Sequence, residues 1–260
     1  MPATIDILIP AVNNSYFTCS LIKSIKANTK IPYKIIYIDN GSEASELERV
    51  INILDGTNYL LVKNSHNLGF VKAINQGLKL SDADYICFQN NDTLIFKNCF
   101  ERLIEHLNKN NNSGIISPLA SSGGGKQAIE IIQTLYSRFD EEIKTINLNK
   151  FSHEEINKIL YDKFKSKALE MNRSLAFFSV VMHRNTFDKV GYLDEQYGLG
   201  LYDDDDYCRR AVSQGFKLLL ALDVYVWHLA SITFKKMYSN HEFMKILLEN
   251  QKLFRAKWNV

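Results

Sequence analysis

Strand-like and helix-like segments alternate through the first half of the chain, and this order constrains the fold more than any other feature. Short apolar runs predict strands at Ile5–Ile9, Tyr33–Ile38, Tyr59–Val62, Tyr85–Phe88 and Gly114–Ser117. Apolar residues at helical spacing predict helices at Phe17–Ile25, Ala44–Leu54, Val71–Leu80 and Phe100–Leu107. This alternation favours right-handed βαβ units and an α/β fold with a mostly parallel central sheet flanked by helices.

The pattern changes after Pro118. Ser121–Gly125 has the composition of a flexible loop, and two helical segments without an intervening strand are predicted at Lys126–Tyr136 and His153–Met171. We interpret residues 119–172 as a helical insertion. A strand at Leu175–Met182, a helix at Arg184–Val190, strands at Leu218–Leu222 and Val224–Trp227, and a closing helix at Asn240–Trp258 follow.

Composition narrows the classes of function. With 260 residues and 46% hydrophobic content, the chain can form a full core, and we expect one domain over residues 1–260. A net charge of +2 gives no reason to expect a nucleic-acid partner. The four cysteines show no spacing typical of zinc sites or disulfide frameworks, which favours a reducing compartment. No secretory leader or membrane-spanning run is recognisable, so we expect a cytoplasmic protein, at most peripheral at the inner face of a membrane.

Polar side chains follow three of the predicted strands. The clusters are Asp39–Ser42, Asn67–Phe70 and Asn90–Asp92, and the last ends the apolar run that begins at Tyr85. Each cluster alone is also typical of a turn or a helix cap. Parallel topology, however, places the carboxyl ends of the strands on one edge of the sheet, where open α/β sheets bind their ligands.

These motifs, in this order, resemble the family 2 inverting glycosyltransferases of GT-A fold, and in particular a rhamnosyltransferase-like subgroup. The resemblance rests on Asp39-Asn40-Gly41-Ser42, Asn67-Leu68-Gly69-Phe70 with Ala73, Asn75 and Gly77, Asn90-Asn91-Asp92-Thr93, Val190-Gly191-Tyr192-Leu193-Asp194-Glu195, the acidic run ending in Arg210, and Trp227-His228. It covers about residues 5–234 apart from the insertion. It implies a nucleotide-sugar half at 1–118, an acceptor half at 173–234 and a C-terminal helix at 235–260.

The resemblance also assigns residues to the donor. Asp39 would hydrogen-bond the base or ribose of the nucleotide. Asn67, Gly69 and Lys72 would border the diphosphate, although Lys72 also fits a solvated helix position. The remaining expected donor-binding residues are Pro10, Asn13, Asn90 and Asn91.

Asn90-Asn91-Asp92 takes the place of the Asp-x-Asp motif with which such enzymes bind Mn²⁺ or Mg²⁺. Asp92 supplies the only carboxylate of the motif, because Asn90 is a neutral donor. The resemblance implies His228 as an additional ligand, and a structural histidine is the alternative. A hard cation here would stabilise the charge on a departing diphosphate.

The acidic run Asp203–Asp206 carries the expected catalytic chemistry. Acids at a helix start are typical of capping, but four consecutive carboxylates repel one another, and crowding raises carboxyl pKa values towards the range of a general base. By the family's Glu-Asp-x-Asp pattern, Asp204 is the base and Asp203 replaces the usual Glu beside the acceptor. Asp206 and Arg210 are spaced to pair on one helix face.

The expected activity is transfer, with inversion, of a sugar from a UDP- or dTDP-sugar to a glycan or lipid-linked acceptor in surface polysaccharide biosynthesis. A nucleotidyltransferase and a catalytically inactive sugar-binding protein of the same fold are the alternatives. Asp194-Glu195 suits either acceptor binding or a turn. The basic C-terminal segment suits either an anionic membrane or an ordinary packed helix.

Overall fold

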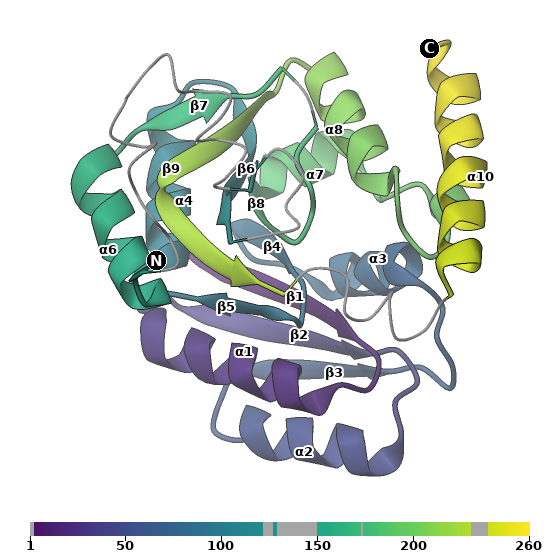
Figure 1. The fold of residues 1–260 in the computed structure, drawn as a ribbon, viewed down its shortest axis with the longest axis horizontal. Helices are drawn as coiled ribbons and strands as arrows, with labels where there is room; N and C mark the ends of the chain where they lie inside the picture. The colour runs from purple at the N-terminus through teal and green to yellow at the C-terminus, as the bar shows by residue number, and fades with distance from the viewer. Residues whose placement is uncertain (1–2, 122–126, 129–149, 173, 230–238) are drawn as a thin grey trace.

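The computed structural model describes residues 3–121, 127–128, 150–172, 174–229 and 239–260, which build one nine-stranded sheet with helices on both faces (Figure 1). The strand order is β3-β2-β1-β4-β8-β6-β9-β5, and β7 pairs with β9 outside this path. The strands are β1 (Ile5–Ala11), β2 (Tyr33–Asp39), β3 (Tyr59–Lys63), β4 (Tyr85–Gln89), β5 (Thr93–Ile95), β6 (Ser113–Ala120), β7 (Ala168–Glu170), β8 (Ser179–His183) and β9 (Lys217–His228).

The first half of the sheet has the parallel topology that the alternation predicts. β1 pairs in parallel with β2 and β4, and β2 with β3. In the second half β6 and β9 are parallel, whereas β8, β5 and β7 run antiparallel to their neighbours. The sheet is therefore mixed, and its uniformly parallel part is the region that places the predicted strand-end clusters on one edge.

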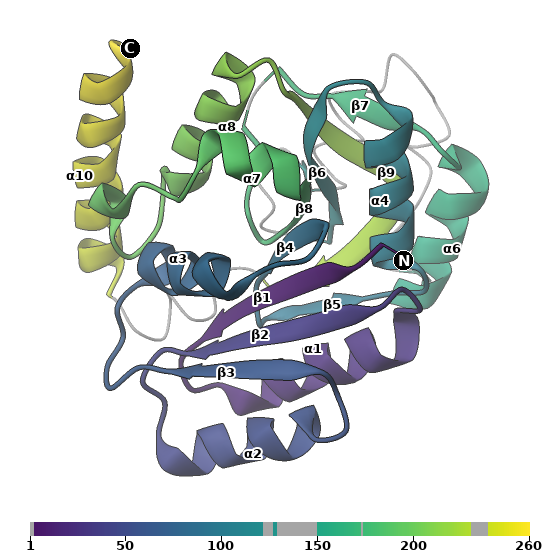
Figure 2. The same ribbon diagram turned by 180° about the vertical axis from the view of Figure 1, so that it is seen from behind.

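Two hydrophobic layers hold the helices against the sheet. Alternating β1 residues divide between them, with Ile7 and Ile9 packing toward α1, α2 and α4 and Leu8 toward α3, α6 and α8. Figure 2, the view from behind, shows α3 on one side of strands β1–β3 and α1 and α2 on the other. The helices are α1 (Ser15–Asn28), α2 (Ala44–Leu54), α3 (Phe70–Leu80), α4 (Cys99–Lys109), α6 (His153–Phe164), α7 (Arg184–Val190), α8 (Asp203–Ser213) and α10 (Asn240–Trp258), with a 3₁₀ turn η4 (Glu195–Tyr197).

The predicted helix over His153–Met171 is wrong at its carboxyl end. Helix α6 ends at Phe164, and Ser166 adopts a left-handed conformation with φ of 61°. The backbone N–H of Ser166 donates to the buried carboxylate of Asp223, which turns the chain so that β7 pairs with β9. The other predicted insertion helix, Lys126–Tyr136, lies largely outside the described residues, as do residues 122–125 of the predicted loop.

Several strand boundaries also differ from the prediction. The strand expected at Leu175–Met182 is confined to β8. The two strands expected near the C-terminus form the single strand β9. The strand continues through Asp223 because this residue is buried against His106, with Oδ1 of Asp223 2.6 Å from Nε2 of His106. Pro10 does not end β1, since β4 pairs only as far as Leu8 and leaves the proline on an unpaired side. The short strand β5 was not predicted.

Helix α10 lies at the periphery of the molecule (Figure 1), and its only buried residue is Asn250. Its bounds, like those of α2 and α7, agree with the sequence prediction. None of the described helices is long and apolar enough to cross a membrane.

Candidate functional site

A cavity of about 280 Å³ lies at the carboxyl ends of the parallel strands. It gathers residues from both halves of the sequence, as the shared strand edge predicts. Among the predicted site residues, those that line it are Pro10, Asn67, Gly69, Asn90, Asn91, Asp92, Asp203, Asp204 and His228.

One corner of this first cavity is built from amide side chains. Asn40 donates from Nδ2 to Oδ1 of Asn67 at 2.7 Å, and Asn64 donates to Oδ1 of Asn40 at 3.1 Å. Oδ1 of Asn67 also accepts from the N–H of Gly69 at 2.9 Å. These bonds fix the loop that leads into α3 and present its backbone to the cavity.

Gly69 joins this corner to the second half of the molecule. Its φ is 87°, and a Cβ there would lie 2.5 Å from the carbonyl oxygen of Gly198. The N–H groups of Phe70 and Val71, at the start of α3, point at the carbonyls of Leu199 and Gly198, each at 3.4 Å. The first amides of α3 are therefore directed at protein rather than at a ligand in the cavity.

Asp92 and His228 form one wall. Both are buried, and the imidazole Nε2 lies 3.5 Å from Oδ1 of Asp92. Thr93 pairs with His228 between β5 and β9, and the imidazole stacks on Phe178 with ring centroids 4.9 Å apart. The short strand β5 thus brings together two residues that are far apart in the sequence.

Hydrogen bonds to α1, to β5 and to the residue before β8 hold the two asparagines that precede Asp92. Asn91 donates to the hydroxyl of Thr18 in α1 at 3.1 Å. The backbone N–H of Asn90 donates to the carbonyl of Phe178 at 2.8 Å, and its carbonyl accepts from the hydroxyl of Thr93. Protein groups therefore fix the turn after β4, which carries Asp92.

The donor set of this wall suits a divalent cation. A carboxylate oxygen and an imidazole nitrogen 3.5 Å apart are close enough for one ion to contact both. Within the described part of the chain no cluster of three His, Cys, Asp or Glu residues is present, so further ligands would be amide oxygens, water or a bound substrate. The mixed oxygen and nitrogen donors suit Mn²⁺ better than Mg²⁺.

Asp203 and Asp204, in the first turn of α8, form another wall of the same cavity. Burial raises the pKa of Asp203 to about 6, and the charge of Asp205 adds to the rise. Burial also raises the pKa of Asp204 well above its ordinary range, and the charges of Asp203 and Asp205 act in the same direction. A carboxylate in this state is suited to accept a proton.

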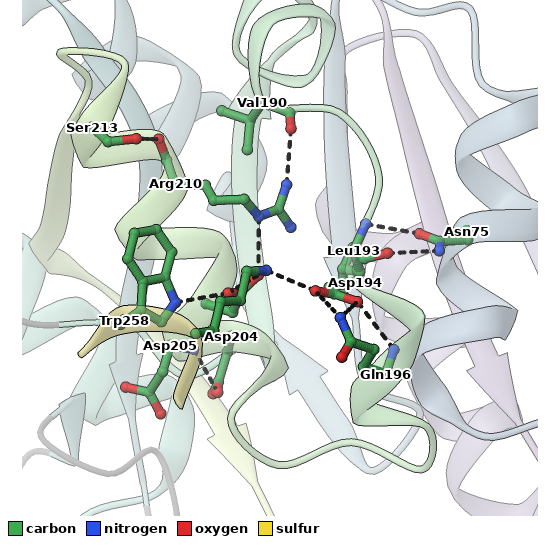
Figure 3. Close-up of polar contacts among 12 residues, drawn as sticks. Asn75, Val190, Leu193, Asp194, Gln196, Asp204, Asp205, Arg210, Ser213 and Trp258 are labelled. Atoms are coloured by element: carbon green, nitrogen blue, oxygen red, sulfur yellow. Dashed lines mark hydrogen bonds and ion pairs between the residues drawn. The ribbon is translucent and has the colours of Figure 1, made fainter. Parts of the chain in front are cut away.

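The other two acids of the run are bound by protein groups. Asp205 accepts a hydrogen bond from the hydroxyl of Ser174. Asp206 is fully buried and accepts from Arg210 and from the indole of Trp258, each at 2.9 Å, while Lys257 lies 2.8 Å away. Figure 3 shows Arg210 and Trp258 converging beside Asp204 and Asp205. The predicted pairing of Asp206 with Arg210 is confirmed.

The loop before α8 is held by helix α10. Gly198, Gly200, Leu201 and Tyr202 all have positive φ, which is costly for the last two. Asn250 donates from Nδ2 to three carbonyls of this region, those of Tyr197 at 3.1 Å, Gly200 at 2.8 Å and Leu201 at 3.0 Å. A single buried amide therefore stabilises the conformation that delivers Asp203 and Asp204.

Three predicted site residues do not line the cavity. Lys72 is exposed on α3. Asn13 binds the neighbouring loop, because its N–H donates to Ser42 and its Oδ1 accepts from the N–H of Glu43. Asp39 is fully buried, with Oδ1 accepting from the N–H of Ser42 at 3.2 Å and Oδ2 without a hydrogen-bond partner among the described residues. Their expected contacts with a nucleotide stay predictions.

The structure adds lining residues that sequence reasoning missed. Asn40 belongs to the motif Asp39-Asn40-Gly41-Ser42, and its position directly after β2 is the sequence feature that could have identified it as a lining residue. Phe178 and Leu199–Leu201 also line the cavity. For Leu199–Leu201, the closely spaced glycines Gly198 and Gly200 are the only sequence feature that indicates an unusual loop. Among the described residues, the lining contains no Lys or Arg.

Comparisons with known sequences agree with this geometry. Residues 6–166 match the protein family described as Glycosyl transferase family 2. An uncharacterized glycosyltransferase of Rickettsia bellii (strain RML369-C) is 26% identical over 161 residues, which cover 61% of this chain and 21% of that protein. The poly(ribitol-phosphate) beta-N-acetylglucosaminyltransferase TarP of Staphylococcus aureus (strain N315) is 29% identical over 133 residues, covering 49% of this chain and 40% of TarP. The chain spans less than half the length of these relatives.

Solved structures share the architecture. The mannosyltransferase PcManGT from Pyrobaculum calidifontis, in complex with GDP-Man and Mn²⁺, superimposes with a TM-score of 0.61 at 12% identity, over 87% of this chain and 56% of that one. GalNAc-T7 with UDP, GalNAc and Mn²⁺ gives 0.62 at 15% identity, over 87% and 43%. The expected α/β GT-A fold is confirmed.

Proposed function

Because the chain belongs to glycosyltransferase family 2, we propose that it transfers a sugar, with inversion, from a nucleotide-diphosphate donor to an acceptor hydroxyl. One observation carries the proposal. Asp92 with His228, and Asp203 with Asp204, line the same cavity at the carboxyl edge of the sheet. The first pair suits the diphosphate end of a donor, and the second suits the hydroxyl that attacks it.

Asp204 acts as the general base in this proposal. Its carboxylate takes the proton from the acceptor hydroxyl while that oxygen forms a bond to the anomeric carbon. The bond from this carbon to the diphosphate oxygen breaks on the opposite face, and its electron pair leaves with the nucleoside diphosphate. A single displacement of this kind inverts the anomeric configuration. Asp203, which raises the pKa of Asp204, also lines the cavity beside the acceptor.

Asp92 and His228 would hold Mn²⁺ or Mg²⁺. The cation would stabilise the negative charge that develops on the leaving diphosphate. Support comes from the lining, which supplies no Lys or Arg among the described residues, and from α3, whose first amides already point at Leu199 and Gly198. Asn67 and Gly69 would border the diphosphate from the other side of the cavity.

The remaining details of the substrates belong to the same proposal. The donor would be a hexose carried by UDP or dTDP, and the acceptor a glycan or lipid-linked glycan in surface polysaccharide biosynthesis. The name of TarP, which acts on poly(ribitol-phosphate), supports a surface-polymer acceptor. Met244 and Leu248, exposed on α10 near Lys252, would contact a membrane that holds such an acceptor.

Donor turnover tests the proposal. The protein is incubated with UDP-, dTDP- and GDP-sugars and Mn²⁺, and release of nucleoside diphosphate is measured. We expect release with one nucleotide class and a loss of about 10²–10⁴-fold in Asp204→Asn, the range for removal of a general base. Asp188→Asn, which changes an exposed carboxylate of α7, is the control and should retain the wild-type rate.

Two outcomes would reject the enzyme proposal. Donor binding without turnover by the wild type would favour the inactive sugar-binding alternative. Release of pyrophosphate from a nucleoside triphosphate in the presence of a sugar phosphate would favour a nucleotidyltransferase.

A further inference from the structure

A second cavity, of about 800 Å³, adjoins the first across Asp204. Asp204 and Ala176 line both cavities. Apart from these two residues, the described lining of the second cavity comes from Glu170–Asn172 and Ser174–Leu175, from Phe216–Leu218, from one face of α8, and from Gln127 and Phe254. The proposed base therefore separates two spaces, of which the larger contains none of the residues assigned to the donor.

One face of α8 forms the floor of this second cavity. Asp204, Asp205, Cys208, Arg209 and Val212 line it, at the spacing of a single helix face. With a rise of 1.5 Å per residue, Arg209 lies about 7.5 Å and Val212 about 12 Å along the axis from Asp204. A cationic residue therefore lines the same cavity as the base, about 1.4 helical turns further along α8.

Two aromatic rings position the exposed side chain of Arg209. Its guanidinium lies over Trp258 at 4.8 Å and over Phe254 at 5.9 Å from the ring centroids. No carboxylate within ion-pair distance of Arg209 occurs among the residues that the structure describes, whereas the adjacent Arg210 binds Asp206. Lys217, the other cation of the lining, is paired with Glu170 at 2.8 Å. A stacked guanidinium keeps its edge donors for planar anions.

We propose that the second cavity binds the acceptor, and that the acceptor carries a phosphate or carboxylate group that Arg209 contacts. A base that deprotonates the acceptor must touch it, so the acceptor lies against Asp204. The donor occupies the first cavity, which leaves the second for the rest of the acceptor. The inference rests on the proposed transfer reaction, because that reaction assigns Asp204 its role.

Ligand-observed saturation-transfer NMR on the whole chain tests this assignment. The probes are glucose, glucose 6-phosphate and glucuronate, so that phosphate and carboxylate are compared on one sugar. We expect one charged probe to bind more tightly than glucose and to weaken about tenfold in Arg209→Gln, as for loss of a charged hydrogen bond. Arg255→Gln, which removes an exposed cation of α10 outside both cavities, should bind like the wild type. Equal binding of the charged probe by wild type and Arg209→Gln overturns the anion assignment.

A steric variant tests the location separately. Val212→Trp places an indole at the solvent-exposed edge of the second cavity, since Val212 lines it and is 51% exposed, and Ser213→Trp places the same bulk on the neighbouring exposed position outside the lining. We expect Val212→Trp to abolish probe binding and to leave binding of nucleoside diphosphate with Mn²⁺ unchanged, while Ser213→Trp retains both. Probe binding that survives Val212→Trp overturns the inference. Failure of the wild type to bind any nucleoside diphosphate would instead overturn the proposed function.

Discussion

Burial raises the pKa values of Asp203 and Asp204. The same burial that suits Asp204 to its proposed role as a base makes the ionised carboxylates costly for the stability of the fold. For Asp203 the rise is from 3.8 to about 6. Between these values the folded chain holds a proton that the unfolded chain releases. The contribution of Asp203 to stability is therefore present at low pH and is lost as the pH rises through 6, and it amounts to roughly 3 kcal/mol.

Removing the charge of Asp203 should therefore stabilise the fold at alkaline pH. We expect Asp203→Asn to melt a few degrees above the wild type at pH 8. The difference in melting temperature between variant and wild type should disappear towards pH 4. Thermal unfolding across this pH range measures the effect. Asp188→Asn should show no comparable pH-dependent gain, and a wild-type advantage at pH 8 would contradict the assignment of a destabilising buried charge.

His228 should set the choice of cation. Imidazole is a better ligand for Mn²⁺ than for Mg²⁺, so we expect the wild type to prefer Mn²⁺ and His228→Ala to lose much of that preference. Calorimetric titration of each metal in the presence of the nucleoside diphosphate measures both affinities. His241→Ala, which changes an exposed histidine of α10, should keep the wild-type ratio. An unchanged ratio in His228→Ala would remove this residue from the metal site.

At the scale of elements, helix α10 and the loop 198–202 form one unit. The loop has backbone conformations that Leu201 and Tyr202 adopt at a cost, and Asn250 supplies the hydrogen bonds that offset it. The loop in turn lines the first cavity and leads directly into Asp203. A peripheral helix therefore controls the position of the proposed base.

Asn250→Ala should lower the rate of transfer more than the affinity for donor. The substitution removes the amide donor shared by three carbonyls, of which that of Tyr197 keeps the N–H of Gly200, at a cost of about 1–3 kcal/mol, and the loop can relax away from the cavity. We expect kcat to fall about tenfold or more, while calorimetry shows similar binding of nucleoside diphosphate with Mn²⁺. Glu249→Ala, at the adjacent exposed position, is the control. A variant with normal kcat would show that the loop holds its conformation without Asn250.

At the scale of the whole molecule, the sheet brings together residues that the sequence separates widely. Asp92 and His228 meet because β5 pairs with β9, and Gly69 meets Gly198 across the two halves. A ligand that contacts both walls should therefore stabilise the entire fold, in proportion to its affinity for the native state.

Nucleoside diphosphate and Mn²⁺ together should raise the melting temperature more than either alone. At about 100 times its dissociation constant a ligand adds roughly 2.7 kcal/mol of stability. Differential scanning fluorimetry with the two ligands, separately and combined, measures the shift. Asp92→Asn should lose the combined effect. If the two shifts are merely additive in the wild type, cation and nucleotide do not share a site.

Elements that depend on neighbouring residues could be predicted from the sequence, whereas elements that depend on distant partners could not. The bounds of α2, α7 and α10 were predictable because apolar spacing along one helix is a local signal. β5, β7 and the continuity of β9 depend on strand partners, and the buried Asp223 looks like an interruption until His106 and Ser166 are placed beside it. The same division holds in the site. Strand-end motifs indicated Asn67 and Asp92, whereas two closely spaced glycines were the only local signal for the loop at Leu199–Leu201, and no local pattern indicated the role of Asn250.

The sparse burial of α10 has a consequence for how the molecule opens. Apart from Phe254, which is partly buried against the core and contacts Tyr202, α10 gains little from apolar packing, and its contacts through Lys257, Trp258 and Asn250 include hydrogen bonds and ion pairs. Its amide protons should accordingly exchange with solvent through a local opening, well before those of β1 and β4 in the sheet. In each such opening the loop ahead of Asp203 loses its anchor, so the fraction of molecules ready for proton transfer is set by the free energy of that local opening rather than by global unfolding.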